Sequence, residues 1–386
     1  MKKATLALIA SLVGITSYTM INNVSNPNAP QGQTTSLQFS KTYQHDSWYN
    51  VIGDPINAVK PVDSGLGQKK GEMMPAPDNS TIIDQLIINF EYAQYRDVPV
   101  TKLPDHLKIK VSPLLYLGHS KSKPQPYTPK FRQYAVWVNY MTDRPSFLYI
   151  QNGNKATGSN QIMNIWYLNT VRDVSAFVHS DWTELYTDLY FVLQELNVPK
   201  KLKGFYSGGE PLFVTTIAQV TDIAFKHTRY NKYYYNRIRP EELAGRIEFG
   251  LPVGIQDSFD LTKFKNHPSV KYNKAKYGTY LLPQAYPEGS PAHPDYTQGH
   301  TALCIAGIET IKRFYDTGAM IDDVELVNWL PTKNWKKISV NTALDQVCNL
   351  IGMGRVMNGV HFVDSYKSAV PTLTKIVNNH LDQLLK

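Results

Sequence analysis

The sequence predicts a mainly α-helical domain, built as a helical bundle with long surface loops. Two observations lead to this fold class. From Val171 onward, apolar residues recur at the spacing of a helix face. Connectors rich in proline and glycine, at residues 202–211 and 278–294, separate these helical stretches. A length of 386 residues with 42% hydrophobic and 19% charged residues suits one large folded domain.

Six stretches carry the helical spacing. They are residues 82–95, 176–196, 212–236, 300–315, 342–357 and 367–385. Residues 125–151 alternate between apolar and polar, which favours extended segments. Residues 22–77 are rich in Pro, Gly, Asn and Ser, and this composition predicts irregular structure that wraps the domain.

The N-terminus has the pattern of an export signal. Lys2 and Lys3 precede an apolar run from Ala4 to Ile15. We therefore expect a signal peptide or N-terminal anchor over residues 1–24 and a secreted or periplasmic protein. The rest, 25–386, is predicted to be a single domain with its active-site core at about 171–386. No segment after the signal is predicted to span a membrane.

The charge and the cysteines limit the function classes. The formal net charge of +8 and the pI of about 9.1 favour an anionic partner. Nucleic acid is not expected, because no basic block with interleaved aromatic residues occurs. The two cysteines, Cys304 and Cys348, exclude a disulfide framework. They lie in predicted helices near the candidate site, and either a pair or two buried thiols fits the sequence.

The first candidate motif runs from Lys232 to Pro240. The separation of Lys232 from Arg239 corresponds to about two helical turns on one face, and Pro240 is expected to end that helix. Two such cations can converge on one anion, and the planar arginine fork suits an oxyanion. A solvated basic face is the ordinary explanation of the same pattern.

The second motif is the loop that leads into the helix at 300–315. Gln298, Gly299 and His300 stand where loop residues give way to helical spacing. The free N–H groups and the dipole of a helix start favour anions. A histidine there can act as an acid or a base near neutral pH.

The third motif follows the predicted helix at 342–357. Arg355 and His361 would point to different faces of an unbroken helix. Asn358 and Gly359 predict a C-cap with a left-handed turn, after which the chain can redirect His361 inward. Taken alone, His361 would be read as a hydrogen-bonded core histidine.

The three motifs together resemble the signature of the superfamily that contains vanadium haloperoxidases and type-2 phosphatidic acid phosphatases. Cations and histidines occur in the same order, each beside a loop–helix boundary. Several loop segments resemble the algal-type vanadium bromoperoxidases more closely. They are Arg96-Asp-Val-Pro99, Arg172-Asp-Val-Ser-Ala-Phe-Val-His-Ser-Asp181, Arg239-Pro-Glu-Glu-Leu-Ala-Gly-Arg-Ile247 and Tyr286-Pro-Glu-Gly-Ser-Pro-Ala-His-Pro-Asp-Tyr296.

The resemblance implies the helical-bundle fold of that superfamily and a vanadate cofactor. The site residues that it implies are the axial vanadium ligand His361, the vanadate-binding Lys232, Arg239, Gln298, Gly299 and Arg355, and the catalytic His300 and His293. His300 would be the acid–base residue. His293 would be the second active-site histidine, which is typical of the bromoperoxidase branch.

The implied activity is oxidation of bromide or iodide by hydrogen peroxide. The product is a hypohalous-acid equivalent that halogenates small organic acceptors. The resemblance also implies a homo-oligomer.

The chain departs from the family pattern at three points. Gln298 stands where a serine is usual, and its amide could also donate to an oxyanion. Ser365 stands four residues after His361, where an aspartate is expected, and Asp364 lies one position early. The carboxylate that orients the acid–base histidine is not identified, and Asp173 and Asp181 are candidates.

Two other functions stay open. An exported acid phosphatase could use the same oxyanion pocket, with His361 as the nucleophile and His300 protonating the leaving group. A non-catalytic oxyanion-binding relative is the other possibility, for which Gln298 and the displaced Asp364 are the evidence.

Overall fold

The computed structural model describes most of the chain after residue 72. The described residues are 73–115, 134–135, 145, 162–163, 168, 170–178, 183–202, 209–251, 253, 260–284, 291, 293–321 and 337–386. The chain divides into two units, Met1–Gln38 and Phe39–Lys386, and all described residues belong to the second. The expected signal or anchor, Asp181 and most of residues 125–151 lie outside the described residues, so those expectations remain predictions.

Helices make up most of the described structure, which confirms the predicted fold class. They are α3 (Ile82–Gln94), α5 (Val171–Phe177), α6 (Thr183–Glu195), α7 (Glu210–Tyr235), α8 (Pro240–Phe249), α9 (Leu261–Asn266), α10 (Pro268–Tyr277), α11 (Gly299–Phe314), α13 (Val340–Met357), α14 (Val363–Lys367) and α15 (Ala369–Leu384). Short 3-10 helices lie at Asn79–Thr81, Val100–Lys102, Asp105–Leu107 and Pro113–Leu115.

The described strands are short and form two antiparallel pairs. Strand β1 (Tyr134–Ala135) pairs with β2 (Ile162–Met163), and β3 (Met320–Ile321) pairs with β4 (Ile338–Ser339). In the first pair Tyr134 faces Met163, and in the second Met320 faces Ser339.

The predicted single helix at 176–196 is wrong. It is two helices, since α5 ends at Phe177 and α6 begins at Thr183. Apolar periodicity alone does not reveal such a break when neither glycine nor proline marks it. The last predicted helix is likewise preceded by a separate short helix, α14.

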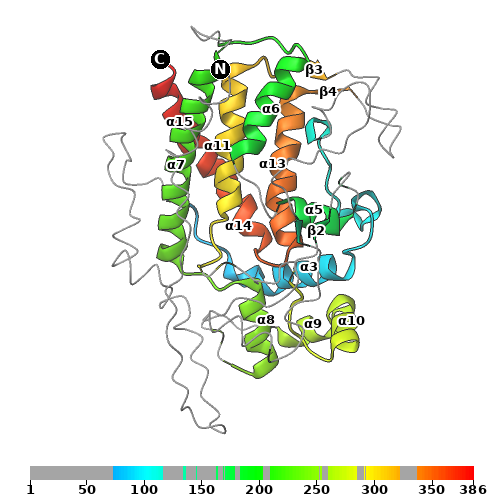
Figure 1. Cartoon of the computed structure of the whole chain (residues 1–386). Helices are drawn as coiled ribbons and strands as arrows, with labels where there is room; N and C mark the ends of the chain where they lie inside the picture. Colours follow the sequence, from blue (N-terminus) through cyan, green and yellow to red (C-terminus); the bar gives the residue numbers. More distant parts are fainter. Residues whose placement is uncertain are drawn as a thin grey trace. The chain divides into compact units, whose positions relative to one another are not determined.

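Helix α11 lies at the centre of the bundle. It contacts α6, α7, α13 and α15, and α7 also contacts α15 (Figure 1). Apolar side chains of these helices form the larger hydrophobic core, which we call the bundle core. Gly307 of α11 permits a close approach to α6, because a Cβ at this position would lie 2.2 Å from Cγ of Tyr186. The close packing of these helices fixes the framework that carries the motifs.

A disulfide joins the two central helices. Cys304 of α11 and Cys348 of α13 are bonded, with 5.4 Å between their Cα atoms. This answers the question that the sequence left open in favour of the pair. Closing a loop between residues 44 apart stabilises the fold by about 4 kcal/mol in the chain-entropy description.

A second, smaller hydrophobic core lies where α3 contacts α8, α9 and α10 (Figure 1). We call it the α3 core. Its buried members are Ile82, Ile83, Leu86, Ile87, Phe90, Ile238, Leu243, Ala244, Ile247, Phe264, Val270, Leu282 and Phe362. Only α3 among these helices was predicted, because the sequences of α8 and α10 are too polar to show a clear apolar stripe.

Among the described helices, none combines the length and the apolar character needed to cross a bilayer.

Candidate active site

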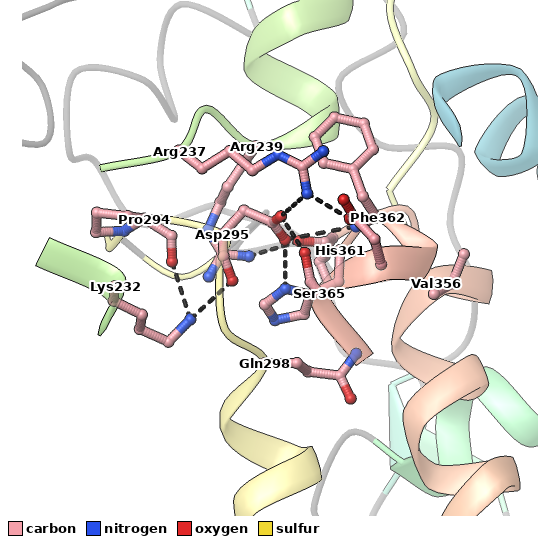
Figure 2. Close-up of polar contacts among 12 residues, drawn as sticks. Lys232, Arg237, Arg239, Pro294, Asp295, Gln298, Val356, His361, Phe362 and Ser365 are labelled. Carbon is pink, nitrogen blue, oxygen red and sulfur yellow. Dashed lines mark hydrogen bonds and ion pairs between the residues drawn. The ribbon is translucent and has the colours of Figure 1, made fainter. Parts of the chain in front are cut away.

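The three sequence motifs meet between the two cores. Lys232 lies in the last turn of α7, Gly299 and His300 begin α11, and Arg355 lies in the last turn of α13. Arg239 and His361 lie in the loops that follow α7 and α13. Lys232, Arg239, Asp295 and His361 are drawn together in Figure 2.

The geometry of the first motif differs from the expectation. Helix α7 ends at Tyr235, and Asn236 adopts the left-handed conformation with φ 44°. Pro240 does not end α7 but is the first residue of α8, and Arg239 precedes it in extended conformation. Asparagine tolerates the left-handed region, and proline suits a first helical position because its missing N–H has no helical partner there. The predicted single helical face for Lys232 and Arg239 is therefore wrong.

Both cations nevertheless reach the same loop. Nζ of Lys232 donates to the carbonyls of Pro294, at 2.9 Å, and Asp295, at 3.0 Å. Nε of the fully buried Arg239 donates to the carbonyl of His293 at 2.6 Å. The loop from residue 293 to residue 298, and not a shared helix, brings the two side chains together.

Arg239 also reaches the loop that carries His361. Its Nη1 donates to the carbonyl of Val360 at 2.5 Å, and its Nη2 lies 3.1 Å from Nδ1 of His293. Nδ1 of His293 also lies 3.2 Å from the carbonyl of Pro294, so this nitrogen accepts from Arg239 in one tautomer and donates to Pro294 in the other. Burial lowers the pKa of His293 well below its ordinary value, and Lys232 and Arg239 lower it further, so the neutral form is favoured.

The turn after α13 is the one that the sequence predicted. Helix α13 ends at Met357, Asn358 is its C-cap, and Gly359 adopts φ 76°. Nε2 of Gln284 donates to the carbonyl of Gly359 at 2.9 Å, and this hydrogen bond from another segment stabilises the turn. The chain then carries His361 inward, and its side chain is buried.

A buried carboxylate holds the ring of His361. Nδ1 of His361 lies 2.6 Å from Oδ1 of Asp295 (Figure 2). Burial lowers the pKa of His361 well below its ordinary value, and Arg239, Lys232 and Arg355 lower it further. A neutral ring with its proton on Nδ1 donates to the carboxylate and leaves the Nε2 lone pair available to a ligand.

Asp295 was missed by the sequence analysis. Its carboxylate is fully buried, accepts from the hydroxyl of Ser365, and lies 3.6 Å from Nη1 of Arg237. Burial raises the pKa of Asp295, while Arg237 and Arg239 oppose that rise. Its place between His293 and Gly299, in a segment with no other acid, was the signal available in the sequence.

Asp364 has another role. Its carboxylate pairs with Nη1 of Arg237, whose guanidinium lies over the ring of Phe362 at 4.8 Å. The backbone N–H of Asp364 donates to Oε1 of Gln85 on α3 at 3.0 Å. Asp364 therefore anchors the start of α14, and its contacts differ from those of Asp295.

Helix α3 supports the His361 loop from the other side. Nδ2 of the buried Asn89 donates to the carbonyl of His361 at 3.0 Å and to that of Val356 at 2.9 Å. The side-chain amide of Asn89 therefore holds two backbone carbonyls, one in α13 and one in the loop that follows it.

The structure gives the Gln298 side chain partners other than the expected oxyanion. Its Nε2 donates to the carbonyl of Gly352 at 3.0 Å, and its Oε1 accepts from the hydroxyl of Thr301 at 2.9 Å. Its backbone N–H donates to the carbonyl of Ser365 at 3.0 Å. The side chain of Gln298 thus ties the start of α11 to α13.

Gly299 and His300 are the first two residues of α11, as the sequence predicted. The positive end of the helix dipole therefore lies beside the loop that receives Lys232 and Arg239. Asp173, one candidate for orienting His300, accepts from the backbone N–H and hydroxyl of Thr170 and so caps α5. An orienting role for Asp173 remains a prediction.

Three cations at the site repel one another. Burial lowers the pKa of Lys232 well below its ordinary value, and repulsion from Arg239 and Arg355 adds to this effect, against Asp295. The same three cations lower the pKa of both His293 and His361. Lys232, Arg239 and Arg355 therefore lie close enough to affect one another in a buried place, an arrangement that suits an oxyanion.

Comparison with known proteins finds similar sequences and a similar fold. Residues 212–385 match the family model of the second helical-bundle domain of VCPO. The chain is 27% identical over 270 residues to a vanadium-dependent bromoperoxidase of Corallina officinalis, covering 60% of this chain and 45% of that protein. It is 30% identical over 268 residues to one of Ascophyllum nodosum, covering 61% of this chain and 47% of that protein. The chain thus spans about half the length of these relatives.

A solved structure has the same fold. It is the homohexameric second vanadate-dependent bromoperoxidase of Ascophyllum nodosum, with a TM-score of 0.62 and 17% identity. The alignment covers 88% of this chain and 76% of that one. Over about 60% of its length the chain is therefore similar in sequence to vanadium-dependent bromoperoxidases, and it has the helical-bundle fold of such an enzyme.

Proposed function

We propose that this chain is a vanadate-dependent haloperoxidase. It would oxidise bromide or iodide with hydrogen peroxide to a hypohalous-acid equivalent, which halogenates small organic acceptors. One observation carries the proposal: Nδ1 of the buried His361 lies 2.6 Å from the Asp295 carboxylate, and Arg239, Lys232 and Arg355 lie close enough to lower the pKa of the ring further than burial does.

The donor set fits vanadate. An imidazole nitrogen can coordinate the metal, and Lys232, Arg239 and Arg355 can neutralise its oxygens. Burial and repulsion from Arg239 and Arg355 lower the pKa of Lys232, and a bound oxyanion would offset both effects. The N–H of Gly299, at the start of α11, is the backbone donor assigned to the same anion. Gln298 is left out of this donor set, because its amide already holds Gly352 and Thr301.

Bound vanadate supplies a Lewis-acidic centre that activates hydrogen peroxide toward halide without changing its own oxidation state. The chain's contribution is preorganisation. Asp295 and Asn89 hold the His361 loop, while Arg239 joins the loops of His293 and His361. His300, at the helix start, is assigned the acid–base step in which a proton leaves the peroxide. His293 is assigned the place of the second active-site histidine, beside Arg239.

Two properties of the whole protein belong to the same proposal. The homohexameric state of the Ascophyllum nodosum bromoperoxidase supports a homo-oligomer for this chain. The basic start and apolar run at residues 1–24 support export, which predicts a secreted or periplasmic protein. Light scattering after size exclusion tests the first, and N-terminal sequencing of the exported protein tests the second.

Bromination assayed beside phosphate-ester hydrolysis tests the activity. The purified apo-protein is assayed with hydrogen peroxide, bromide and a dimedone-type acceptor, with and without orthovanadate. We expect bromination only with orthovanadate. Hydrolysis of a nitrophenyl phosphate without bromination would contradict the proposal in favour of a phosphatase, and neither activity would indicate an oxyanion-binding protein.

A further inference from the structure

Residues 295 and 365 form one contact beneath His361. Asp295 comes from the loop before α11, and Ser365 comes from α14. The Ser365 hydroxyl donates to Oδ2 of Asp295, while Oδ1 of the same carboxylate lies 2.6 Å from Nδ1 of His361. Both residues are fully buried. One carboxylate oxygen therefore serves the ring, and the other is held by the hydroxyl.

This carboxylate is the one that determines the ring's tautomer. Asp364, the other acid beside the ring, pairs with Arg237 and not with His361. Arg237 also lies 3.6 Å from Oδ2 of Asp295, so it supports the ionised carboxylate. The Asp295 oxygen at 2.6 Å is placed to accept from an N–H on Nδ1, and that tautomer leaves Nε2 free to bind a ligand.

The contact requires one acid and one hydroxyl. A second carboxylate at position 365 would place two buried like charges in contact, which is unfavourable. With a hydroxyl at both positions, no carboxylate would accept from Nδ1 of His361. Arg237 would also lose the carboxylate that lies beside it in this contact. Ser365 lies in α14, and its hydroxyl contacts the carboxylate that holds the His361 ring, so an acid at position 365 would lie close to the same ring.

We infer that Asp295 is the positioning residue of His361, and that Asp295 and Ser365 work as an exchanged pair. The acid stands at 295 and the hydroxyl at 365, where the sequence pattern around His361 led us to expect an aspartate. The inference rests on the proposed function only in taking His361 as the ligand of the oxyanion.

Four proteins test the inference: the wild type, Asp295→Ser, Ser365→Asp and the double variant. The first measurement needs no ligand. Proteins labelled with ¹⁵N-histidine report the His361 tautomer by NMR, and the His361→Gln variant identifies its signals by their loss. We expect a protonated Nδ1 in the wild type, a mixed or reversed tautomer in Asp295→Ser, and a protonated Nδ1 again in the double variant.

The second measurement is orthovanadate affinity by titration calorimetry. Loss of a partner of a ligating histidine lowers affinity by about 10–100-fold. We expect losses of that size in both single variants and recovery to within about threefold in the double variant. Asp364→Asn is the matched control, because it removes a neighbouring carboxylate that does not touch His361. The tautomer of His361 should be the same in this variant as in the wild type.

Two results would overturn the inference: an unchanged tautomer in Asp295→Ser, or a double variant that shows no recovery. If Asp295→Ser does not fold, the double variant decides alone, since a folded protein with a protonated Nδ1 supports the exchange and an unfolded one refutes it. A different result would refute the proposed function. A wild type that shows the Nδ1 tautomer but no vanadate-dependent bromination refutes the haloperoxidase and leaves this inference standing.

Discussion

The two hydrophobic cores of the molecule differ in how they are built. The bundle core is dominated by the long helices α7, α11, α13 and α15, to which α5, α6 and short 3-10 helices add, whereas the α3 core joins α3 to the shorter α8, α9 and α10 and to single residues of loops. His361 lies at their boundary, because Val360 belongs to the bundle core and Phe362 to the α3 core. The difference teaches that helix ends supply Lys232 and Arg355, while the loops between the two cores supply Arg239, the histidine and its carboxylate.

This comparison predicts that a substitution at the boundary changes binding, whereas one inside a core changes stability. His361→Ala should have the largest effect. Loss of the ligand itself is expected to lower orthovanadate affinity by more than about 100-fold, since even its supporting partners contribute 10–100-fold. Titration calorimetry measures the affinity, and bromination should fall with it.

His106→Ala is the matched control, because His106 pairs with Glu91 on the surface and lies outside the site. It should bind orthovanadate as the wild type does. A His361→Ala protein that keeps wild-type affinity would remove His361 from the site.

A buried histidine of the bundle should affect stability through pH. Burial lowers the pKa of His227, on α7, to about 4 from an ordinary value of 6.5. The unfolded chain therefore takes up a proton as the pH falls below about 6.5, while the folded chain does not. Stability is lost between pH 6.5 and about 4, by up to about 3 kcal/mol.

Urea unfolding at pH 7 and pH 5 measures this loss. In His227→Gln the loss should be smaller than in the wild type. Equal pH dependence in the two proteins would show that His227 is not the group responsible.

Close packing inside the bundle gives a third prediction. Gly307→Ala places a Cβ against the ring of Tyr186 and should lower the free energy of unfolding by about 1–3 kcal/mol. Gly299→Ala on the same helix is the control, since its Cβ would lie 3.6 Å from Phe225, an ordinary contact. Thermal melts of both variants compare them, and equal melting temperatures would contradict the packing argument.

Gln298 can be tested for a role in stability against a role in oxyanion binding. If its amide ties α11 to α13, Gln298→Ser should lower the free energy of unfolding by about 1–2 kcal/mol. Orthovanadate affinity should then change by less than about threefold. A tenfold loss of affinity with unchanged stability would instead show that the amide donates to the oxyanion, as the sequence analysis expected.

The sequence predicted the bundle better than the α3 core. Helices with a continuous apolar stripe, such as α7 and α11, were predicted within two residues of their ends. The break between α5 and α6 was not, because it has no glycine or proline to mark it. Helices α8 and α10 were missed because their few apolar residues contact a core that only the folded chain creates.

The site residues were found by type and order, but their contacts were not. A left-handed turn at Gly359 follows from local chemistry, so it was predictable and is confirmed. The contact between Asp295 and His361 joins residues 66 apart in sequence, and no periodicity reports such a pair. For the same reason, the ties from Gln298 to Gly352 and from Asn89 to His361 could only be seen in the folded chain.

Direct binding of orthovanadate to the wild-type apo-protein tests the central claim, that the cations and His361 form an oxyanion site. Equilibrium dialysis should give saturable binding of one vanadate per chain, displaced by excess inorganic phosphate. Absence of saturable binding to a folded protein, or binding that phosphate does not displace, would contradict it.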